Sequence, residues 1–354
     1  MIVGIVGLPS SGKTTLFRAL TRGTVKINEY GSGKPNVGVV NVPDERIDYF
    51  AKQYNPKKTT YASIQFIDGA AKVDTGGAKF GADFFADVRR VDALVHVVAA
   101  FPDASQAMSN LHALNDELLL ADMQMVENRM ERIEKQLHGV KKGALTPATI
   151  ENALLERLKD AFENGKPLKS MDFSADEMKF INSYSFLTLK PMIIVLNVAE
   201  DMIGSESEEI VAFRKYCEEE LLGELELCAE IEMEVAELPD EEEAEFLASM
   251  GIKEPARNAL IKKTYEMLGL ISFITAGEPE VRAWTIHKGE TAIDAAGTIH
   301  SDIARGFIRA EVANFKQIEE VGSWEEAKRQ GIVTLQGKDY VVEDGDVMYI
   351  RNKV

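Results

Sequence analysis

The chain has 354 residues, of which 45% are hydrophobic and 28% are charged. This balance is typical of a folded globular protein, and the length allows about two or three domains. Lys and Arg number 40 against 58 Asp and Glu, a net charge of −18. Such a charge excludes a protein that coats DNA through bulk positive charge. Cys217 and Cys228 form no CxxC pair, so we expect two buried thiols in a reducing compartment.

No segment has the length of a membrane span. The longest apolar runs, at residues 93–101 and 192–196, fall short of the roughly 20 residues that a spanning helix requires. The amino end has no basic region, and Gly and Pro interrupt it within its first residues, unlike a signal peptide. We therefore expect a cytoplasmic protein with no membrane partner.

The amino end carries the most specific motif of the chain. Residues 2–6 are apolar and β-branched, which predicts a strand buried on both faces. The next eight residues read GLPSSGKT, the pattern GxxxxGK[ST] of a phosphate-binding loop. Residues 15–20 then predict a helix with one apolar face. Strand, loop and helix together are the context that this motif requires.

The residue types of the loop suit a polyphosphate. Gly7 and Gly12 allow a tight turn that aims backbone amides at an anion, and the helix N-terminus adds partial positive charge. Lys13 supplies a full charge, and the Thr14 hydroxyl can bind Mg²⁺. The predicted phosphate-binding residues are Gly7, Ser10, Ser11, Gly12, Lys13, Thr14 and Thr15.

Two further residues are candidates for the metal. The polar, Gly-rich segment 21–36 is expected to be a loop, and Ser32 is its best-placed hydroxyl for Mg²⁺, although Ser is also common in loops. Residues 62–68 predict a strand that ends at Asp68. An Asp at this place can hold Mg²⁺ through water, and the alternative is an Asp that caps a turn. The predicted metal site is Thr14, Ser32 and Asp68, with Lys13 and Asp68 as catalytic residues.

The elements after the loop alternate between strand and helix. We predict strands at 37–42, 91–101, 191–197 and 225–229, helices at 44–53 and 254–268, and a further helix that opens with the acidic segment 239–245. His96, inside the second of these strands, is expected to be a hydrogen-bonded core residue. A heptad seam is formed by Leu119, Met123, Val126, Met130, Ile133 and Leu137. Together with an amphipathic stretch at 150–162 it predicts an antiparallel helical hairpin.

The fold predicted from these elements is α/β. Residues 1–273 form a P-loop NTPase domain, a mostly parallel sheet flanked by helices, with a coiled-coil helical insertion at 112–182. From residue 274 short strands separated by Gly and Asp turns, at 283–286, 310–313, 333–335, 340–342 and 347–350, predict a small α+β domain over 274–354. Arg305, Arg309 and Lys316 could contact phosphate there, or form an ordinary solvated face.

The order of these features resembles the YchF/Obg-like ATPase family. The resemblance covers nearly the whole chain, including GIVGLPSSGKTTLFRALT, PNVGVVNVPDERID, ITAGEPEVRAWTIHKGETA and LQGKDYVVEDGDVMYIR. It implies that residues 274–354 are a TGS-like β-grasp domain and that the hairpin is the coiled-coil insertion of the family. It also implies a nucleoside triphosphatase linked to the ribosome and translation, with ribosome or RNA as partner through these two parts.

The residues predicted to choose the base are Asn197, Val198 and Glu200. They belong to the sequence NVAE, where related GTPases have NKxD. The Asp of that motif takes two hydrogen bonds from guanine, and Glu is one methylene longer, so the same grip is displaced. The resemblance to the family, which shares NxxE, favours ATP over GTP, but either nucleotide could bind.

Three departures from the family pattern concern the chemistry. Ser10 replaces an Asn of the phosphate loop, Ser32 stands for a Thr of the first switch, and the second switch reads DGAAK, with Ala71 in place of a Gly. No Gln stands nearby to orient water. We therefore expect slow hydrolysis. The alternative is a nucleotide-dependent regulatory module with little or no turnover. A small-molecule kinase is a weaker alternative, because no second substrate signature is visible.

Overall fold

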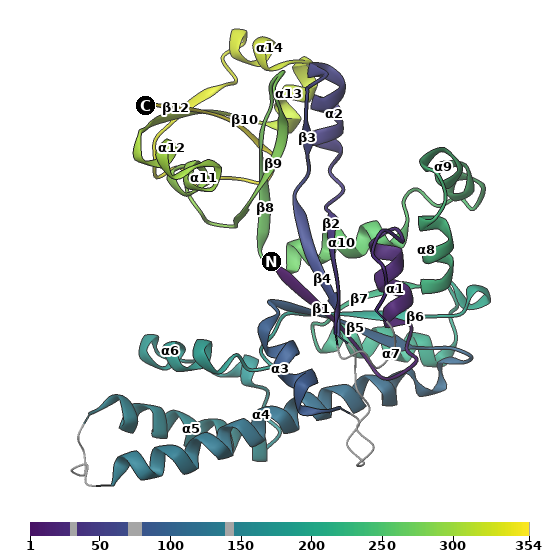
Figure 1. Cartoon of the computed structure of the whole chain (residues 1–354), viewed down its shortest axis with the longest axis vertical. Coiled ribbons are helices and arrows are strands. Elements are labelled where there is room, and N and C mark those ends of the chain that lie inside the picture. The colour runs from purple at the N-terminus through teal and green to yellow at the C-terminus, as the bar shows by residue number, and fades with distance from the viewer. Residues whose placement is uncertain (29–33, 70–79, 139–144, 354) are drawn as a thin grey trace. The chain divides into compact units, whose positions relative to one another are not determined.

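The computed structural model describes residues 1–28, 34–69, 80–138 and 145–353. They form two compact units (Figure 1). Unit 1 contains Met1–Gly38 and Gln65–Ile252, and unit 2 contains Val39–Ile64 and Lys253–Val354. The chain therefore enters unit 2 twice.

The core of unit 1 is a sheet with the strand order β2-β4-β1-β5-β6-β7. Its strands are β1 (Ile2–Val6), β2 (Asn36–Asn41), β4 (Ser63–Asp68), β5 (Ala93–Ala99), β6 (Met192–Asn197) and β7 (Gly223–Leu227). Pairing is parallel from β4 through β1, β5 and β6 to β7. β1, β5 and β6 are buried almost throughout, as expected where helices cover both faces.

The helices of unit 1 follow the strands in the alternation that the sequence predicts. They are α1 (Lys13–Leu20), α3 (Ala82–Arg90), α4 (Ala107–Leu137), α5 (Pro147–Glu163), α6 (Ala175–Tyr184), α7 (Glu208–Glu219), α8 (Ala229–Ala236) and α9 (Asp240–Ser249), with 3-10 turns at Ala104–Gln106, Leu168–Ser170 and Glu200–Met202. The predicted P-loop NTPase fold is thus confirmed. Among the described residues no helix is both long and apolar enough to cross a membrane.

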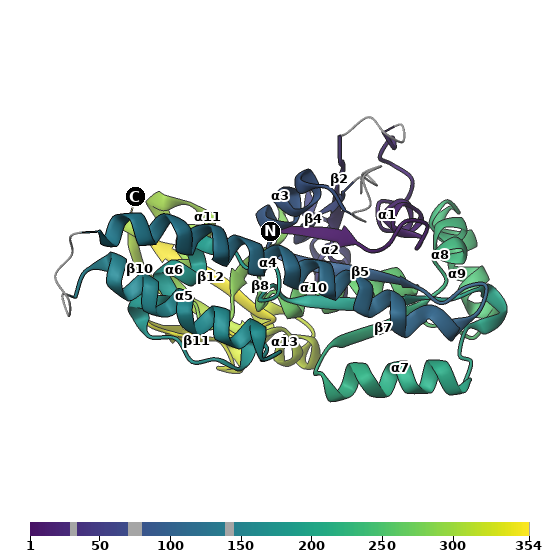
Figure 2. The same ribbon diagram turned by 90° about the horizontal axis from the view of Figure 1, so that it is seen from below.

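The predicted helical hairpin is present. α4 and α5 lie side by side in both views (Figures 1 and 2). Val126 and Ile133 of the heptad seam are buried against Leu154 and Leu158 of α5, and the other four seam residues pack against the same cluster. The predicted turn at 139–147 lies partly outside the described residues. Both cysteines are buried free thiols, as expected.

Unit 2 is built on a second sheet, with the order β11-β10-β12-β8-β9-β3. Its strands are β3 (Thr59–Thr60), β8 (Leu270–Thr275), β9 (Val281–His287), β10 (Phe307–Asn314), β11 (Thr334–Gln336) and β12 (Asp346–Asn352). Its helices are α2 (Glu45–Tyr54), α10 (Ala256–Met267), α11 (Ala292–Ile299), α12 (Ser301–Arg305), α13 (Phe315–Val321) and α14 (Trp324–Arg329). Apolar residues of α11 pack on one face of the sheet, beside Phe273 and Met348.

Two sequence predictions differ from the observed unit 2. The predicted strand at 340–342 is wrong, because within the described residues only an isolated bridge joins Val341 to Thr291. The predicted division between residues 273 and 274 falls inside β8, which begins at Leu270 and pairs with β9 along its whole length. A strand cannot be divided without losing its ladder of hydrogen bonds, so β8 lies in unit 2 as a whole.

Residues 39–64 fold with the C-terminal part of the chain, which the sequence did not indicate. β3 pairs in parallel with β9. From α2, Tyr49 and Phe50 both make edge-to-face contacts with Phe315, at ring-centroid distances of 5.3 and 5.7 Å. Aromatic pairs of this geometry add to the stabilisation that burial gives. The segment between the first and second switches therefore belongs structurally to unit 2.

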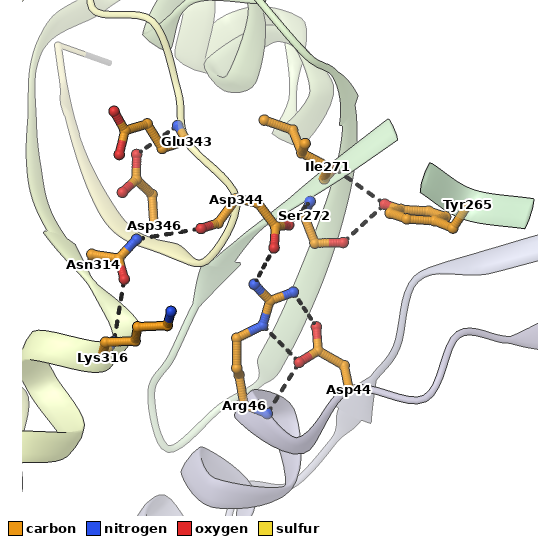
Figure 3. A network of polar contacts seen from close by, with 10 residues as sticks. All are labelled: Asp44, Arg46, Tyr265, Ile271, Ser272, Asn314, Lys316, Glu343, Asp344 and Asp346. Carbon is orange, nitrogen blue, oxygen red and sulfur yellow. Dashed lines mark hydrogen bonds and ion pairs between the residues drawn. The ribbon is translucent and has the colours of Figure 1, made fainter. Parts of the chain in front are cut away.

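An ion-pair network also ties α2 to the strands of unit 2 (Figure 3). The Asp44 carboxylate caps α2 by accepting from the Arg46 backbone N–H at 3.0 Å, and it binds the Arg46 guanidinium through two contacts of 2.8 Å. Arg46 also binds Asp344 at 2.7 Å, which in turn accepts from the Ser272 N–H at 2.8 Å. Gly345, at φ +85°, leaves room for Arg46, whose Nη1 lies 2.8 Å from where a Cβ would be.

Replacing Arg46 is expected to destabilise unit 2. Arg46→Met leaves the Asp44 side chain, only 8% exposed, without its cation, which costs about 3 kcal/mol. Both tryptophans of the chain, Trp284 and Trp324, lie in unit 2, so a urea titration followed by tryptophan fluorescence reports on this unit. Arg90→Met, which removes an exposed ion pair of unit 1, is the control and should leave the midpoint unchanged. An unchanged midpoint for Arg46→Met would contradict the assignment of residues 39–64 to this unit.

Candidate phosphate-binding site

The loop between β1 and α1 has the backbone conformation that its glycines permit. Gly7 has φ +154°, and a Cβ there would meet the Val97 carbonyl oxygen and, at 2.7 Å, the Ser11 hydroxyl. Gly12 has φ +93°, and a Cβ there would overlap the Asn197 amide nitrogen. Ser10 also lies in the left-handed region, at φ +61°. The turn therefore requires glycine at both positions that the motif names.

Helix α1 begins directly after this turn, at Lys13. Gly12 is its N-cap residue, and no side chain caps the helix within the part of the chain that is described. The amides of a first helical turn have no partner inside the helix, and they point where an anion would lie. The four predicted residues Gly12, Lys13, Thr14 and Thr15 thus contribute their amides to the same concave turn.

Lys13 is held close to the loop. Its ammonium group donates to the Leu8 carbonyl oxygen at 2.7 Å. Burial lowers the pKa of Lys13 to about 8, while the negative charge of Asp68 opposes this shift. The loop carbonyl holds the ammonium group in place, and a phosphate oxygen could replace that carbonyl as the acceptor.

Thr14 and Asp68 form the predicted oxygen pair. The Thr14 hydroxyl donates to Asp68 Oδ2 at 2.8 Å. Asp68 is the last residue of β4, opposite Ile5 of β1, and is 4% exposed. A hydroxyl and a carboxylate are the hard oxygen donors that Mg²⁺ takes, so these two residues fit the metal that the sequence predicts. Ser32, the third predicted ligand, and residues 70–72 of the second switch lie outside the described residues.

Asn197 supports the loop from the neighbouring strand. Its amide nitrogen donates to the Ser11 carbonyl oxygen at 3.0 Å, and its amide oxygen accepts from the Ala229 N–H at 2.9 Å. This amide therefore joins the loop to the start of α8. The Val198 side chain is 1% exposed and lies in a core cluster, so it offers no apolar surface to a base. Glu200 is exposed, at the first position of a 3-10 turn.

His96 is not the hydrogen-bonded core residue that the sequence led us to expect. It is fully buried on β5 opposite Val6, and neither ring nitrogen has a partner among the described residues. Burial, reinforced by the positive charge of Lys13, lowers the pKa of His96 to about 3, so the ring is neutral. The strand pattern gave its burial correctly, but no sequence signal tells whether an imidazole inside a sheet finds a partner.

Sequence reasoning also missed Asn36. Its side-chain nitrogen donates to Asp68 Oδ2 at 3.1 Å, and its oxygen accepts from the Asn28 N–H at 2.7 Å. Asn36 is the first residue of β2 and is 8% exposed. An amide directly before the apolar run of residues 37–40 was the available signal, because such a group needs partners once it is buried.

A polyphosphate needs several amides and one ammonium group in one concave turn, and this chain builds that turn between the first strand and the first helix of a parallel sheet. Fold and loop together are those of the P-loop nucleoside-triphosphate-binding proteins. Within this class the chain belongs to the YchF family.

That membership rests on full-length similarity. The chain is 41% identical to the Ribosome-binding ATPase YchF of Bacillus subtilis, covering 100% of both chains, and 39% identical to the protein of the same name from Pasteurella multocida, covering 99% of both. The solved structure of the Schizosaccharomyces pombe YchF GTPase matches with a TM-score of 0.85 and 30% identity, over 99% of this chain and 97% of that one.

Two family models match separate parts of the chain. A model described as a 50S ribosome-binding GTPase matches residues 2–129, which include the phosphate-binding loop. The model for the C-terminal part of YchF GTPases, described as a protein of unknown function, matches residues 270–353. The second match begins with β8, the strand that the predicted division cut.

Nucleotide affinity is expected to fall as the pH rises above about 8. Bound phosphate favours the charged form of Lys13, so its pKa is higher in the complex than in the free loop, where it is about 8. Affinity is therefore full below the free pKa and falls up to about tenfold per pH unit above it. Calorimetry with MgATP between about pH 7 and 9.5 measures this. Lys13→Arg, which stays charged, should show a flat profile, and a flat profile for the unmodified protein would contradict the assignment.

Proposed function

We propose that the chain is a Mg²⁺-dependent switch that binds and slowly hydrolyses a nucleoside triphosphate, with ATP preferred to GTP. The observation that carries this is the meeting of the Lys13 turn with the hydrogen-bonded pair of Thr14 and Asp68. A buried carboxylate beside a helix N-terminus and a lysine is an arrangement suited to binding a metal ion together with an anion.

Each predicted residue has a separate task in this proposal. Gly7, Ser10, Ser11, Gly12 and Thr15 shape the loop or present backbone amides to the β- and γ-phosphates. Lys13 places a point charge on the same oxygens. Thr14 binds Mg²⁺, Asp68 holds the ion through water, and Ser32 completes the set. When bound, Mg²⁺ neutralises charge on the phosphates during transfer.

Base recognition is assigned to the end of β6. Asn197 is held against the loop by two hydrogen bonds, and the exposed Glu200 follows at the turn. The longer Glu side chain displaces the paired contact that an Asp makes with guanine, so we favour ATP. The relatives named above as ATPases support this preference, whereas the name of the yeast structure, a GTPase, keeps GTP as the competing nucleotide.

The partner that we propose is the ribosome. The curated relatives carry ribosome binding in their names. This chain also has two parts that contribute no residue to the phosphate-binding loop, the α4–α5 hairpin and the C-terminal residues of unit 2. A long exposed hairpin is suited to partner binding. In this proposal the protein works in the cytoplasm, and RNA contact occurs through the ribosome.

A phosphate-release assay separates a slow enzyme from a pure binding module. With MgATP we expect turnover below about 10⁻² s⁻¹, as in unassisted switch NTPases, and none above background for Lys13→Ala. Lys215→Ala, which changes an exposed lysine of α7, is the matched control and should keep the full rate. If the unmodified protein binds MgATP but releases no more phosphate than Lys13→Ala, the alternative of a regulatory module without turnover holds instead.

The base preference is tested by shortening Glu200. Calorimetry with MgATP and MgGTP should give tighter binding of ATP to the unmodified protein. Glu200→Asp should raise the affinity for GTP by about tenfold, because a second hydrogen bond to guanine is restored. Glu206→Asp, at an exposed position just before α7, should change neither affinity. Equal affinities, or tighter binding of GTP by the unmodified protein, would overturn the assignment.

A further inference from the structure

We infer that Asn36, which is not among the predicted site residues, positions the Asp68 carboxylate for the metal. The inference rests on the proposed function, since it assumes that Asp68 holds Mg²⁺. Two described donors meet at one oxygen atom. Asp68 Oδ2 accepts from the Thr14 hydroxyl at 2.8 Å and from the Asn36 amide at 3.1 Å.

The orientation of the Asn36 amide is fixed by its partners. The Asn28 backbone N–H can only donate, so the group that faces it at 2.7 Å is the Asn36 oxygen. The amide nitrogen must then face Asp68, whose carboxylate can only accept when ionised. One side chain thus uses both of its polar atoms. Neither aspartate nor leucine could make the same two contacts in that position.

The two donors act on the carboxylate in a specific way. Asp68 is buried, and a buried carboxylate with a single donor could still rotate about its side-chain bonds. A second donor on the same oxygen holds the group in one orientation. Mg²⁺ demands near-ideal octahedral geometry, so the water through which Asp68 holds the ion must be placed accurately by that carboxylate. Groups that orient metal ligands typically contribute 10–100-fold to metal affinity, although they do not touch the metal.

Asn36 also connects the carboxylate to the first switch. Asn28 precedes the segment that contains Ser32, and its backbone N–H reaches only the Asn36 side chain among the described groups. Asn28 also donates through its own side chain to the Pro35 carbonyl oxygen at 3.0 Å. The two contacts differ, because replacing the Asn28 side chain removes the second and leaves the first intact. This difference supplies a matched control.

The test compares nucleotide affinity with and without metal. Calorimetry with ATP is performed on the unmodified protein, Asn36→Ala, Asn36→Leu and Asn28→Ala, each in Mg²⁺ and in EDTA. We expect both Asn36 variants to lose about tenfold or more in affinity in Mg²⁺ and to match the unmodified protein in EDTA. Asn28→Ala should match the unmodified protein in both conditions, and titration of Mg²⁺ into the ATP-bound protein should show weaker metal binding for the Asn36 variants alone.

Several outcomes would overturn the inference. Equal loss in Mg²⁺ and in EDTA, or failure of both Asn36 variants to fold as judged by circular dichroism, assigns Asn36 to the structure of the loop rather than to the metal. If the Asn36 variants bind ATP as tightly as the unmodified protein in both Mg²⁺ and EDTA, Asn36 has no role in the site. These outcomes differ from failure of the proposed function, in which the unmodified protein itself binds no ATP in Mg²⁺.

Discussion

The site depends on the absence of one side-chain atom. At Gly12 any Cβ would overlap the Asn197 amide, and this same amide holds the Ser11 carbonyl oxygen and the Ala229 N–H. The close approach lets a side chain of β6 fix both the loop and the start of α8. In the part of the chain that the structure describes, no side chain caps the amides of α1. An anion site of this kind is pre-organised, and little ordering has to accompany binding.

Both charged groups of the site have hydrogen-bond partners within the chain. Lys13 donates to a loop carbonyl oxygen, and Asp68 accepts from Thr14 and Asn36. At Asp68, which is 4% exposed, an unpaired charge would cost roughly 3–5 kcal/mol in stability. Burial lowers the pKa of Lys13, and the negative charge of Asp68 opposes this shift. A phosphate and a metal ion would supply the missing charges, so ligand binding and the stability of the loop are thermodynamically linked.

The features that could be predicted from the sequence are those formed by residues close together along the chain. The loop, α1 and the Asp68 strand end are local patterns, and their geometry follows from glycine conformations and strand periodicity. The hairpin was predictable because its seam repeats every seven residues. The contacts of Asn36, and the lack of a partner for His96 among the described residues, were not predictable, since both depend on atoms brought close by other strands. Val198 shows the same limit: a motif gives the position of a residue but not the direction of its side chain, and this side chain lies in the core.

The membership of residues 39–64 in unit 2 shows the same limit on a larger scale. The apolar face of α2 has the periodicity of any amphipathic helix, so the sequence predicts burial but not the partner. The partner is set by Phe315 and by the Arg46 network, both far along the chain. β2 and β4 carry Asn36 and Asp68 within unit 1, and the residues that join these two strands belong to unit 2. Asn36 and Asp68, which are joined by a hydrogen bond, therefore flank in sequence the segment that folds into unit 2. A domain boundary drawn once along the sequence cannot represent this arrangement.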